Sequence, residues 1–198
     1  VDEDTPLTPG TRRGEQRVLA ERQWQGLAAA HDLPLHIFRL AGIYGPGRGP
    51  FSKVRDGTAR RIIKPGQVFS RTHVEDIAQV LEASIRQPNP GAAYNVCDDD
   101  PAPPEDVIGH AAELLGLPVP PAIPYDEAEM TPMARSFYAE SKRVRNDRIK
   151  EELKKLGVEI PVFASVDYYP SRKESHRMNT TILEAYGAEP SRATLKLV

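Results

Sequence analysis

An apolar segment that runs directly into a glycine- and proline-rich turn constrains the fold of this chain most. Residues 33–43 are apolar at most positions, as is typical of a strand buried in a parallel sheet. The turn that follows contains Gly45, Pro46, Gly47 and Gly49, which end regular structure. Because open α/β sheets bind ligands at the carboxyl ends of their strands, we expect this turn to face a ligand.

Composition and charge exclude several classes of protein. The net charge of −2 gives no electrostatic case for binding nucleic acid or an anionic membrane. Cys97 is the single cysteine, so we expect a reducing, cytoplasmic compartment and no internal disulfide. No apolar run approaches membrane-spanning length, and the five histidines have no metal-ligand spacing. We therefore expect no membrane contact and no metal site.

Alternating helical and extended patterns predict an α/β fold with a largely parallel sheet flanked by helices. The expected helices cover about 8–31, 51–57, 74–86, 103–115 and 141–156, and the expected strands cover 33–43 and 92–97, with a small strand pair around Ile62 and Val68. Residues 118–132 are expected to form a proline-rich loop. We expect the strands at 33–43 and 92–97 to be parallel neighbours, with helix 74–86 crossing between them.

The predicted helices carry apolar stripes and one clear start signal. Thr72 and Glu75 have the spacing of a capping box, in which each side chain bonds the other residue's amide. The expected core faces consist of Ala20, Trp24, Leu27 and Ala28 in the first helix, Val74, Ile77, Ala78, Leu81 and Ile85 in the third, and Ile149, Leu153 and Leu156 in the last. Residues 153–198 differ in character and predict a smaller α+β portion, a strand-helix-strand tail beyond a first domain at 1–152.

Short motifs within residues 1–152 together resemble the extended short-chain dehydrogenases/reductases, the NAD-dependent epimerase/dehydratase family. The motifs are Arg39 to Pro46 around the turn, Arg71 to Ala78 with its His-Val-x-Asp core, and the Tyr94-Asn95-Val96 strand. The resemblance implies a partial Rossmann-like fold, NAD or NADP as cofactor, a small-molecule substrate such as a nucleotide sugar, and a homo-oligomer. It also implies an NAD(P)-dependent oxidoreductase.

The same resemblance implies roles for particular residues. Those expected at the cofactor are Arg39, Gly42, Tyr44, Gly45 and Pro46, and those expected at the substrate are Arg48, Arg71 and His73. His73 and Asp76 have two interpretations, general acid/base catalysis or a structural helix start. Asp98-Asp99-Asp100 has two as well, a cation site or, as favoured here, a solvated turn.

Two departures from the family pattern limit the expected activity. The chain has no Gly-x-x-Gly-x-x-Gly turn, so we expect it to start mid-domain and to bind NAD or NADP only when that half is supplied. Arg13 and Arg17 stand where the family has its catalytic tyrosine and lysine. Arginine cannot exchange protons near neutrality, although Arg17 could donate to a ribose or phosphate, and a solvent-facing basic helix is the alternative. Tyr44 is the substitute candidate for proton transfer, unless it only packs.

Two further interpretations concern the basic side chains and the tail. Arg55, Arg60, Arg61 and Lys64 form a solvated basic face or a phosphate-binding track. The Pro190-Ser191-Arg192-Ala193-Thr194 segment resembles part of the Rid family of enamine/imine deaminases, which implies that Arg192 binds a substrate carboxylate. The alternatives to an incomplete, impaired oxidoreductase portion are thus a Rid-like deaminase fragment and a non-catalytic binding or scaffold module.

Overall fold

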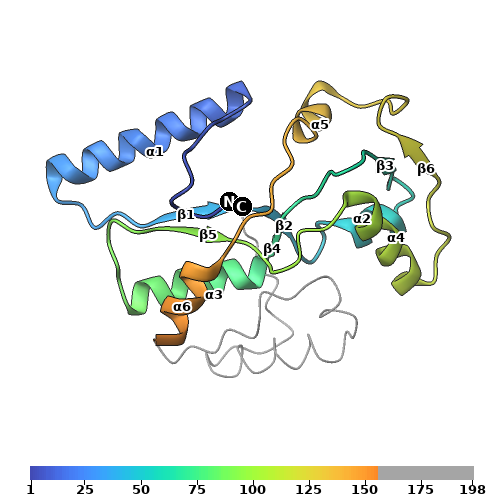
Figure 1. The fold of residues 1–198 in the computed structure, drawn as a ribbon. Helices are drawn as coiled ribbons and strands as arrows, with labels where there is room; N and C mark the ends of the chain where they lie inside the picture. The colour runs from blue at the N-terminus through green and yellow to red at the C-terminus, as the bar shows by residue number, and fades with distance from the viewer. Residues whose placement is uncertain (156–198) are drawn as a thin grey trace. The chain divides into compact units, whose positions relative to one another are not determined.

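The computed structural model describes residues 1–155, in which helices and parallel strands alternate (Figure 1). The helices are α1 (Arg12–His31), α2 (Pro50–Arg55), α3 (Val74–Arg86), α4 (Pro104–Leu115), α5 (Pro132–Phe137) and α6 (Asp147–Lys155). The strands are β1 (Ile37–Leu40), β2 (Gly42–Tyr44), β3 (Arg61–Ile63), β4 (Arg71–His73), β5 (Ala93–Val96) and β6 (Ala122–Pro124). The predicted α/β, partial Rossmann-like fold is confirmed. The expected α+β tail, with Leu156 and Arg192, lies outside the described residues, and the domain boundary near 152 stays a prediction.

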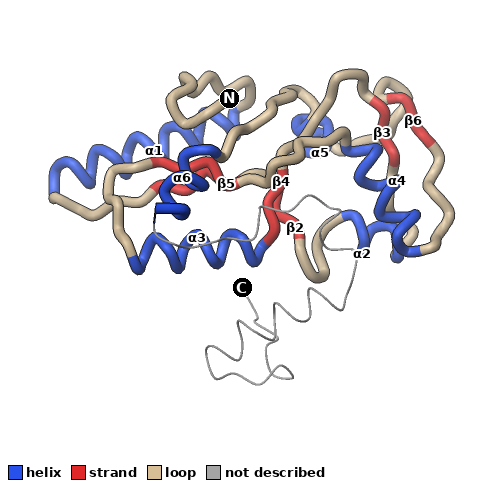
Figure 2. Tube along the Cα trace, turned by 60° about the horizontal axis from the view of Figure 1, so that its bottom comes forward, coloured by secondary structure: helices blue, strands red, loops and turns tan. Residues whose placement is uncertain are grey.

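The described strands form three parallel pairs, β1 with β5, β2 with β4, and β3 with β6. In the first pair Ile37 lies opposite Ala93 and Leu40 opposite Val96, which confirms the predicted parallel neighbours. Figure 1 places α1 on one side of the β1–β5 pair and α3 on the other, and Figure 2 shows α6 beside β5. The pair therefore separates two helical layers, as in a Rossmann-like sheet.

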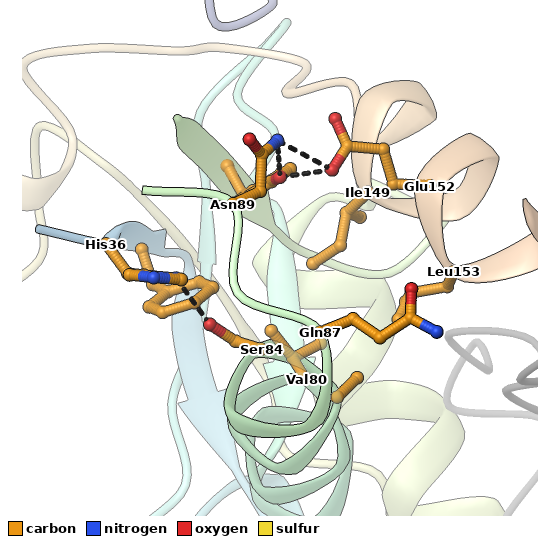
Figure 3. Close-up of a pocket in the computed structure, with 11 residues that line it drawn as sticks. His36, Val80, Ser84, Gln87, Asn89, Ile149, Glu152 and Leu153 are labelled. Carbon is orange, nitrogen blue, oxygen red and sulfur yellow. Dashed lines mark hydrogen bonds between the residues drawn. The ribbon is translucent and has the colours of Figure 1, made fainter. Parts of the chain in front are cut away.

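The main core joins α3, β5 and α6. Its buried side chains are Val80, Ala83, Tyr94, Val96, Ile149 and Leu153. Ile149 and Leu153 lie four positions apart on α6, so both reach the same face of that helix, as the sequence predicts. Burying side chains of this size stabilises the fold by about 1.5–3 kcal/mol each. A hollow lies over part of this core, and Figure 3 shows the residues that line it.

Helix α1 has good local signals but buries no residue within the described chain. Thr11 caps its start by accepting a hydrogen bond from the Gly14 amide, and Asp32 ends it in the left-handed conformation. The predicted apolar stripe is nevertheless exposed, with 57% of the surface of Trp24 and 46% of that of Leu27 accessible. Packing of this stripe against a core was therefore a wrong prediction for the described residues.

The start of α3 differs from the predicted capping box. His73 is the N-cap, and its ring accepts a hydrogen bond from the amide of Glu75 at 3.3 Å. Thr72 instead belongs to β4 and is completely buried. The capping-box prediction was wrong because β4 extends one residue further than the pattern suggested, so the next side chain takes the capping position.

The buried face of α3 is also rotated from the predicted one. Asp76, Val80 and Ala83 are its buried residues. Leu81 and Ile85, predicted as core, are 43% and 80% exposed. The apolar residues of α3 are compatible with either of two buried faces. The face that packs inward is the one that carries the polar Asp76.

The third strand pair differs from the expected local one. Strand β3 pairs with β6, so Ile62 lies opposite Ile123 from the segment predicted as a loop. Val68 is buried but is not part of a strand. The predicted pair around Ile62 and Val68 was wrong because the partner of β3 comes from a distant part of the chain.

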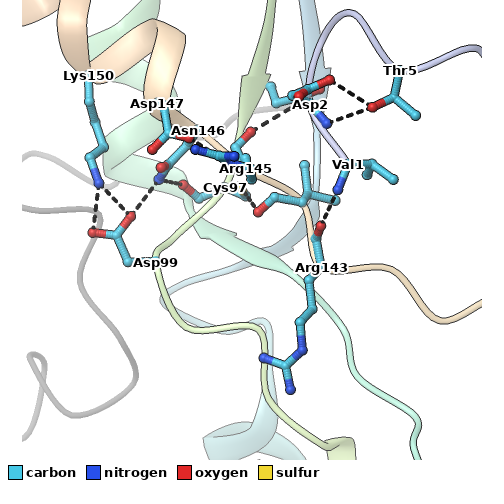
Figure 4. A network of polar contacts seen from close by, with 12 residues as sticks. Val1, Asp2, Thr5, Cys97, Asp99, Arg143, Arg145, Asn146, Asp147 and Lys150 are labelled. Atoms are coloured by element: carbon cyan, nitrogen blue, oxygen red, sulfur yellow. Dashed lines mark hydrogen bonds and ion pairs between the residues drawn. The ribbon is translucent and has the colours of Figure 1, made fainter.

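A polar network ties the first residue of the chain to the segment before α6 (Figure 4). The Val1 amino group donates to the carbonyl of Arg143 at 2.7 Å, and the Arg145 amide donates to the Val1 carbonyl at 2.8 Å. Asn146 then donates to the Cys97 carbonyl at 2.8 Å, just after β5. These bonds fix the start of α6 against the end of β5.

Candidate functional site

A group of buried and half-buried polar residues lies where β2, β4 and β5 end. We call it the strand-end cluster, and it consists of Tyr44, Arg71, Thr72, His73, Asp76 and Asp98. Tyr44 and His73 are the last residues of β2 and β4, and Asp98 follows β5 by two positions. The carboxyl ends of parallel strands are where open α/β folds bind their ligands. The cluster is therefore the candidate site of the described chain.

The rings of Tyr44 and His73 form the centre of the cluster. The two residues are opposite one another in the β2–β4 pair, and their ring centroids are 5.1 Å apart at an interplanar angle of 68°. This edge-to-face arrangement is a favourable one for aromatic rings. Both side chains are less than 10% exposed, so the structure brings these two predicted site residues together in a dry environment.

The environment of His73 keeps its ring neutral. Burial lowers the pKa of His73 from 6.5 to about 4. Its Nδ1 atom accepts the Glu75 amide bond, so the proton of the neutral ring is on Nε2. At pH 7 His73 is thus a neutral ring that caps α3, which fits the structural interpretation of this residue.

Burial also disfavours ionisation of Tyr44. It raises the pKa of the phenol well above its usual value of 10, and the negative charges of Asp98 and Asp76 raise it further. A tyrosine that acts as a general base needs the opposite shift. Tyr44 as a catalytic residue stays a prediction, and in this environment its hydroxyl remains protonated at neutral pH.

The two carboxyls of the cluster are its groups that titrate near neutrality. Burial raises the pKa of both Asp76 and Asp98 from 3.8 to about 7, with Glu75 adding to the shift at Asp76 and Arg71 opposing it at Asp98. Each is 2% exposed. Among the described residues, one oxygen of each carboxyl and the Thr72 hydroxyl have no hydrogen-bond partner. Perturbed, incompletely bonded acids of this kind mark functional sites more often than ordinary cores.

The burial of Asp98 corrects the interpretation of Asp98-Asp99-Asp100 as a solvated turn. The interpretation is wrong for Asp98, whose amide bonds the Arg71 carbonyl at 2.6 Å. It fits Asp100, which is exposed, while Asp99 pairs with Lys150 at 2.9 Å. The position of Asp98 just beyond a parallel strand was the signal that could have identified it.

Arg71 lies at one side of the strand-end cluster, where it bonds two backbone carbonyls. Its Nη1 donates to the carbonyls of Phe69 and Ala102 at 2.9 and 3.3 Å, which are paired in an isolated bridge. Burial lowers its pKa, whereas the nearby charge of Asp98 raises it, and the guanidinium stays charged at neutral pH. The expected contact of Arg71 with a substrate stays a prediction.

The glycine- and proline-rich turn closes tightly beside His73. The backbones of Gly45 and Arg48 exchange two hydrogen bonds of 2.9 and 3.0 Å, with Pro46 and Gly47 at the tip. A Cβ atom on Gly45 would lie 2.7 Å from the Cγ1 atom of Val74, so this position requires glycine. Arg48 itself is exposed.

The other residues expected at the cofactor are engaged within the chain. Arg39 donates from Nη2 and Nε to the carboxylate of Glu21 at 2.7 and 3.2 Å, and also to the Glu3 carbonyl. The Gly42 amide bonds Ser70 as part of the β2–β4 pairing. The assignments of Arg39 and Gly42 to a cofactor site therefore stay predictions.

Arg13 and Arg17 both lie exposed on α1. The Arg13 guanidinium lies 6.0 Å from the ring centroid of Phe137, a cation–π contact. No described contact links either arginine to the strand-end cluster. Their predicted roles also remain untested.

The basic residues after the turn hold the backbone together. Arg60 donates to the Glu129 carbonyl, Arg61 donates to those of Glu105 and Pro120, and Lys64 donates to that of Tyr138. These donors are thus used internally, which disfavours a phosphate-binding track.

Within residues 1–155 no group of three or more His, Cys, Asp or Glu side chains could hold a metal ion. None of the helices in this part of the chain is long and apolar enough to cross a membrane.

Comparison with curated proteins finds partial relatives. The chain is 33% identical over 138 residues to 3-diazoavenalumate denitrifying reductase of Streptomyces sp, covering 63% of this chain and 43% of that protein. It is 35% identical over 127 residues to Protein YeeZ of Escherichia coli, covering 61% and 42%. A stretch of 59 residues is 61% identical to the acetone carboxylase beta subunit of Xanthobacter autotrophicus, covering 30% and 8%. The chain thus spans less than half the length of these relatives, and no family model matches it.

Solved structures decide the fold. A conserved protein of unknown function from Silicibacter pomeroyi is 68% identical, with a TM-score of 0.72 over 82% of this chain and 56% of its own. The dTDP-glucose 4,6-dehydratase DesIV of Streptomyces venezuelae, solved with NAD, has a TM-score of 0.67 at 16% identity, covering 93% and 56%. The UDP-glucose 4-epimerase of Thermus thermophilus, also with NAD, has a TM-score of 0.60 at 17% identity, covering 77% and 51%. The chain has the fold of the NAD-dependent epimerases and dehydratases.

The epimerase/dehydratase fold confirms the first resemblance predicted from the sequence. The second resemblance, of the segment around Arg192 to the Rid family, is not supported. Of the residues that the sequence suggested for a site, the structure brings Tyr44, Arg71 and His73 together at the strand ends, and their roles stay predictions. Sequence reasoning missed the burial of Asp98 and of Thr72.

Proposed function

We propose that this chain is the substrate-side portion of an NAD(P)-dependent oxidoreductase of the epimerase/dehydratase type, acting on a small molecule such as a nucleotide sugar. The observation that carries the proposal is the strand-end cluster, in which buried titratable groups gather at the carboxyl ends of parallel strands. The fold comparisons support the same reaction class, since the dehydratase and the epimerase were both solved with NAD.

We further propose that the chain has no turnover by itself. Arg13 and Arg17 cannot exchange protons at neutral pH, and burial keeps the phenol of Tyr44 protonated. A dinucleotide-binding half that supplies a glycine-rich phosphate turn is required for cofactor binding, and the cofactor would supply hydride transfer.

The test joins this chain to the corresponding upstream half of the Silicibacter pomeroyi protein, which is 68% identical over the shared part. Conversion of dTDP-glucose and UDP-glucose to product is followed by chromatography in the presence of NAD, because epimerisation and dehydration return the hydride to the sugar and leave no net NADH, using the hybrid as it stands and its Arg13→Tyr variant. We expect turnover to rise at least tenfold above background in the tyrosine variant, because it restores a group that can donate and recover a proton.

Arg12→Tyr is the matched control, since it places the same side chain one position away on the same exposed helix turn. It should leave the hybrid inactive. Equal turnover in the unmodified hybrid, abolished by Tyr44→Phe, would instead assign the proton transfer to Tyr44. Tight NADH binding without turnover in any variant would contradict the proposed reaction class.

A further inference from the structure

Within residues 1–155 strand β5 has a strand partner, β1, along one edge only. The Ile37 amide donates to the Ala92 carbonyl at 3.3 Å, and the Ala41 amide donates to the Val96 carbonyl at 3.1 Å. The even-numbered positions of β5 therefore turn their backbone groups toward β1. Because these groups alternate along a strand, those of positions 93, 95 and 97 point to an outer edge. An open edge of this kind can pair with a strand of another chain.

Two side chains from the beginning of α6 cover carbonyls of this outer edge. Asn146, just before the helix, donates to the Cys97 carbonyl at 2.8 Å (Figure 4). Arg148, in the first turn, donates from Nη1 to the Ala93 carbonyl at 3.3 Å. Its Nη2 atom also donates to the Asp4 carboxylate at 2.7 Å, so the guanidinium is held from a second direction.

Glu3 covers the outer-edge amide that lies between these two carbonyls. Its Oε1 atom accepts a hydrogen bond from the Asn95 amide at 2.8 Å. The backbone of Glu3 is itself fixed, because its carbonyl accepts a bond from Arg39 at 3.2 Å. We call Glu3, Asn146 and Arg148 the edge cap. Side chains of the edge cap thus occupy one backbone group at each of the three outward-facing positions.

The sequence of β5 makes an uncovered edge prone to pairing. Residues 92–97 contain no charged residue, no proline and no glycine, and they include the strand-forming Tyr94 and Val96. Uncharged six-residue segments of this composition pair with copies of themselves when they are exposed. Edge strands commonly carry a charged residue or a proline that prevents this. In this chain the charges at the edge come from Glu3 and Arg148, outside the strand.

We propose that the edge cap closes an interaction surface whose partner is β5 of a second copy of this chain. With the cap in place, the row of outward-facing backbone groups is interrupted at each of its positions. Without it, the outer amides and carbonyls bond those of the second β5. The inference concerns assembly and does not depend on the proposed oxidoreductase function.

The test is the double variant Glu3→Ala, Arg148→Ala of the full 198-residue chain, studied by sedimentation velocity. The matched control is Glu3→Gln, Arg145→Ala, which also loses one charge of each sign. It keeps an acceptor for the Asn95 amide and keeps Arg148, and Arg145 is an exposed residue whose side chain pairs with Asp147. At about 100 μM protein we expect the weight-average mass of the double variant to exceed that of the unmodified chain by about half or more, and that of the control to be unchanged.

A third variant adds Ala93→Pro to the double variant. Position 93 is the first residue of β5 and its amide points to the outer edge, so proline removes an outer donor and no bond to β1. We expect this variant to return to the mass of the unmodified chain. An unchanged mass in the double variant, an equal rise in the control, or a rise that Ala93→Pro does not reverse would overturn the proposal.

Circular dichroism reports whether each variant keeps its helices. If the double variant unfolds, Glu3→Ala is compared with Glu3→Gln, since both leave Arg148 and Asn146 in place and only the second keeps an acceptor for the Asn95 amide. We then expect a rise in mass for Glu3→Ala alone, and equal masses of the two single variants would overturn the proposal.

Discussion

Helices α1 and α3 flank the same β1–β5 pair, yet they are held in opposite ways. Helix α1 has 20 residues and none is buried, and Arg39 and Glu21 join it to β1 by an ion pair. Helix α3 has 13 residues and buries three side chains, two of them in the main core. The comparison teaches that packing, and not helix length, decides which helix is fixed. The two helices also carry different candidate residues, because the exposed Arg13 lies on α1 and α3 begins in the strand-end cluster.

The largest expected effect comes from removing the charge of Asp76, in the first turn of α3. Glu15, in the first turn of α1, provides the comparison. The pKa of Asp76 rises from 3.8 to about 7 on folding, so the folded state binds more protons than the unfolded state between about pH 4 and 7. The cost of its charged form is absent below pH 4, grows through this window, and is complete above pH 7. Asp76→Asn removes that cost.

The free energy of unfolding of Asp76→Asn minus that of the unmodified chain should therefore be larger at pH 8 than at pH 4, by on the order of 2–4 kcal/mol. Urea unfolding at both pH values measures the free energy of unfolding. His73 acts in the opposite direction, since its lowered pKa costs stability below pH 6.5, but both proteins contain it and it cancels in the difference. Glu15→Gln, at an exposed position, is the control and should show no such change.

A smaller effect is expected from truncating one apolar side chain on each helix. Val80→Ala on α3 removes two methyl groups at a site that is 2% exposed and should lower the free energy of unfolding by about 2 kcal/mol. Leu27→Ala on α1 removes more atoms, but Leu27 is 46% exposed, so we expect a change below about 0.5 kcal/mol. Comparable losses in the two variants would mean that α1 is packed against a partner in solution, and the contrast between the helices would fail.

The smallest expected effect is on the link between α1 and β1. Arg39→Ala removes the bidentate contact with Glu21, whose side chain is 15% exposed, and should lower overall stability by about 1 kcal/mol. Hydrogen exchange should accelerate more in α1 than in α3, because the main core does not depend on this pair. Uniform acceleration in both helices would show that the ion pair supports the whole fold.

The sequence predicted the elements that local patterns indicate. It did not predict the elements that depend on a distant part of the chain. The β1–β5 pair was predictable because Ile37–Leu40 and Ala93–Val96 are short segments in which three of four residues are apolar or aromatic. The pairing of Ile62 with Ile123 was not, since no local pattern indicates which distant segment completes β3. The inward face of α3 was missed because a buried acid, Asp76, occupies it, contrary to the usual preference of carboxylates for solvent.

The candidate site shows the same division. The tight turn at Gly45 and the position of His73 at a helix start followed from glycine chemistry and motif spacing. The burial of Asp98 did not, because a run of three aspartates has the composition of a solvated turn. Its environment is made by Arg71 and Tyr44 from two other strands, and only the tertiary structure brings these residues together.

The parallel pairing of all three described strand pairs also bears on how the chain reaches its fold. Parallel neighbours cannot be joined by a hairpin, so every pair must wait for a partner that appears much later along the chain. The bond between Val1 and Arg143 spans 142 positions, and the bond between Asp4 and Arg148 spans 144. Closing such long loops costs entropy before any contact repays it. During synthesis, therefore, β1 leaves the ribosome well before β5 does, and its edge stays without that partner until β5 appears.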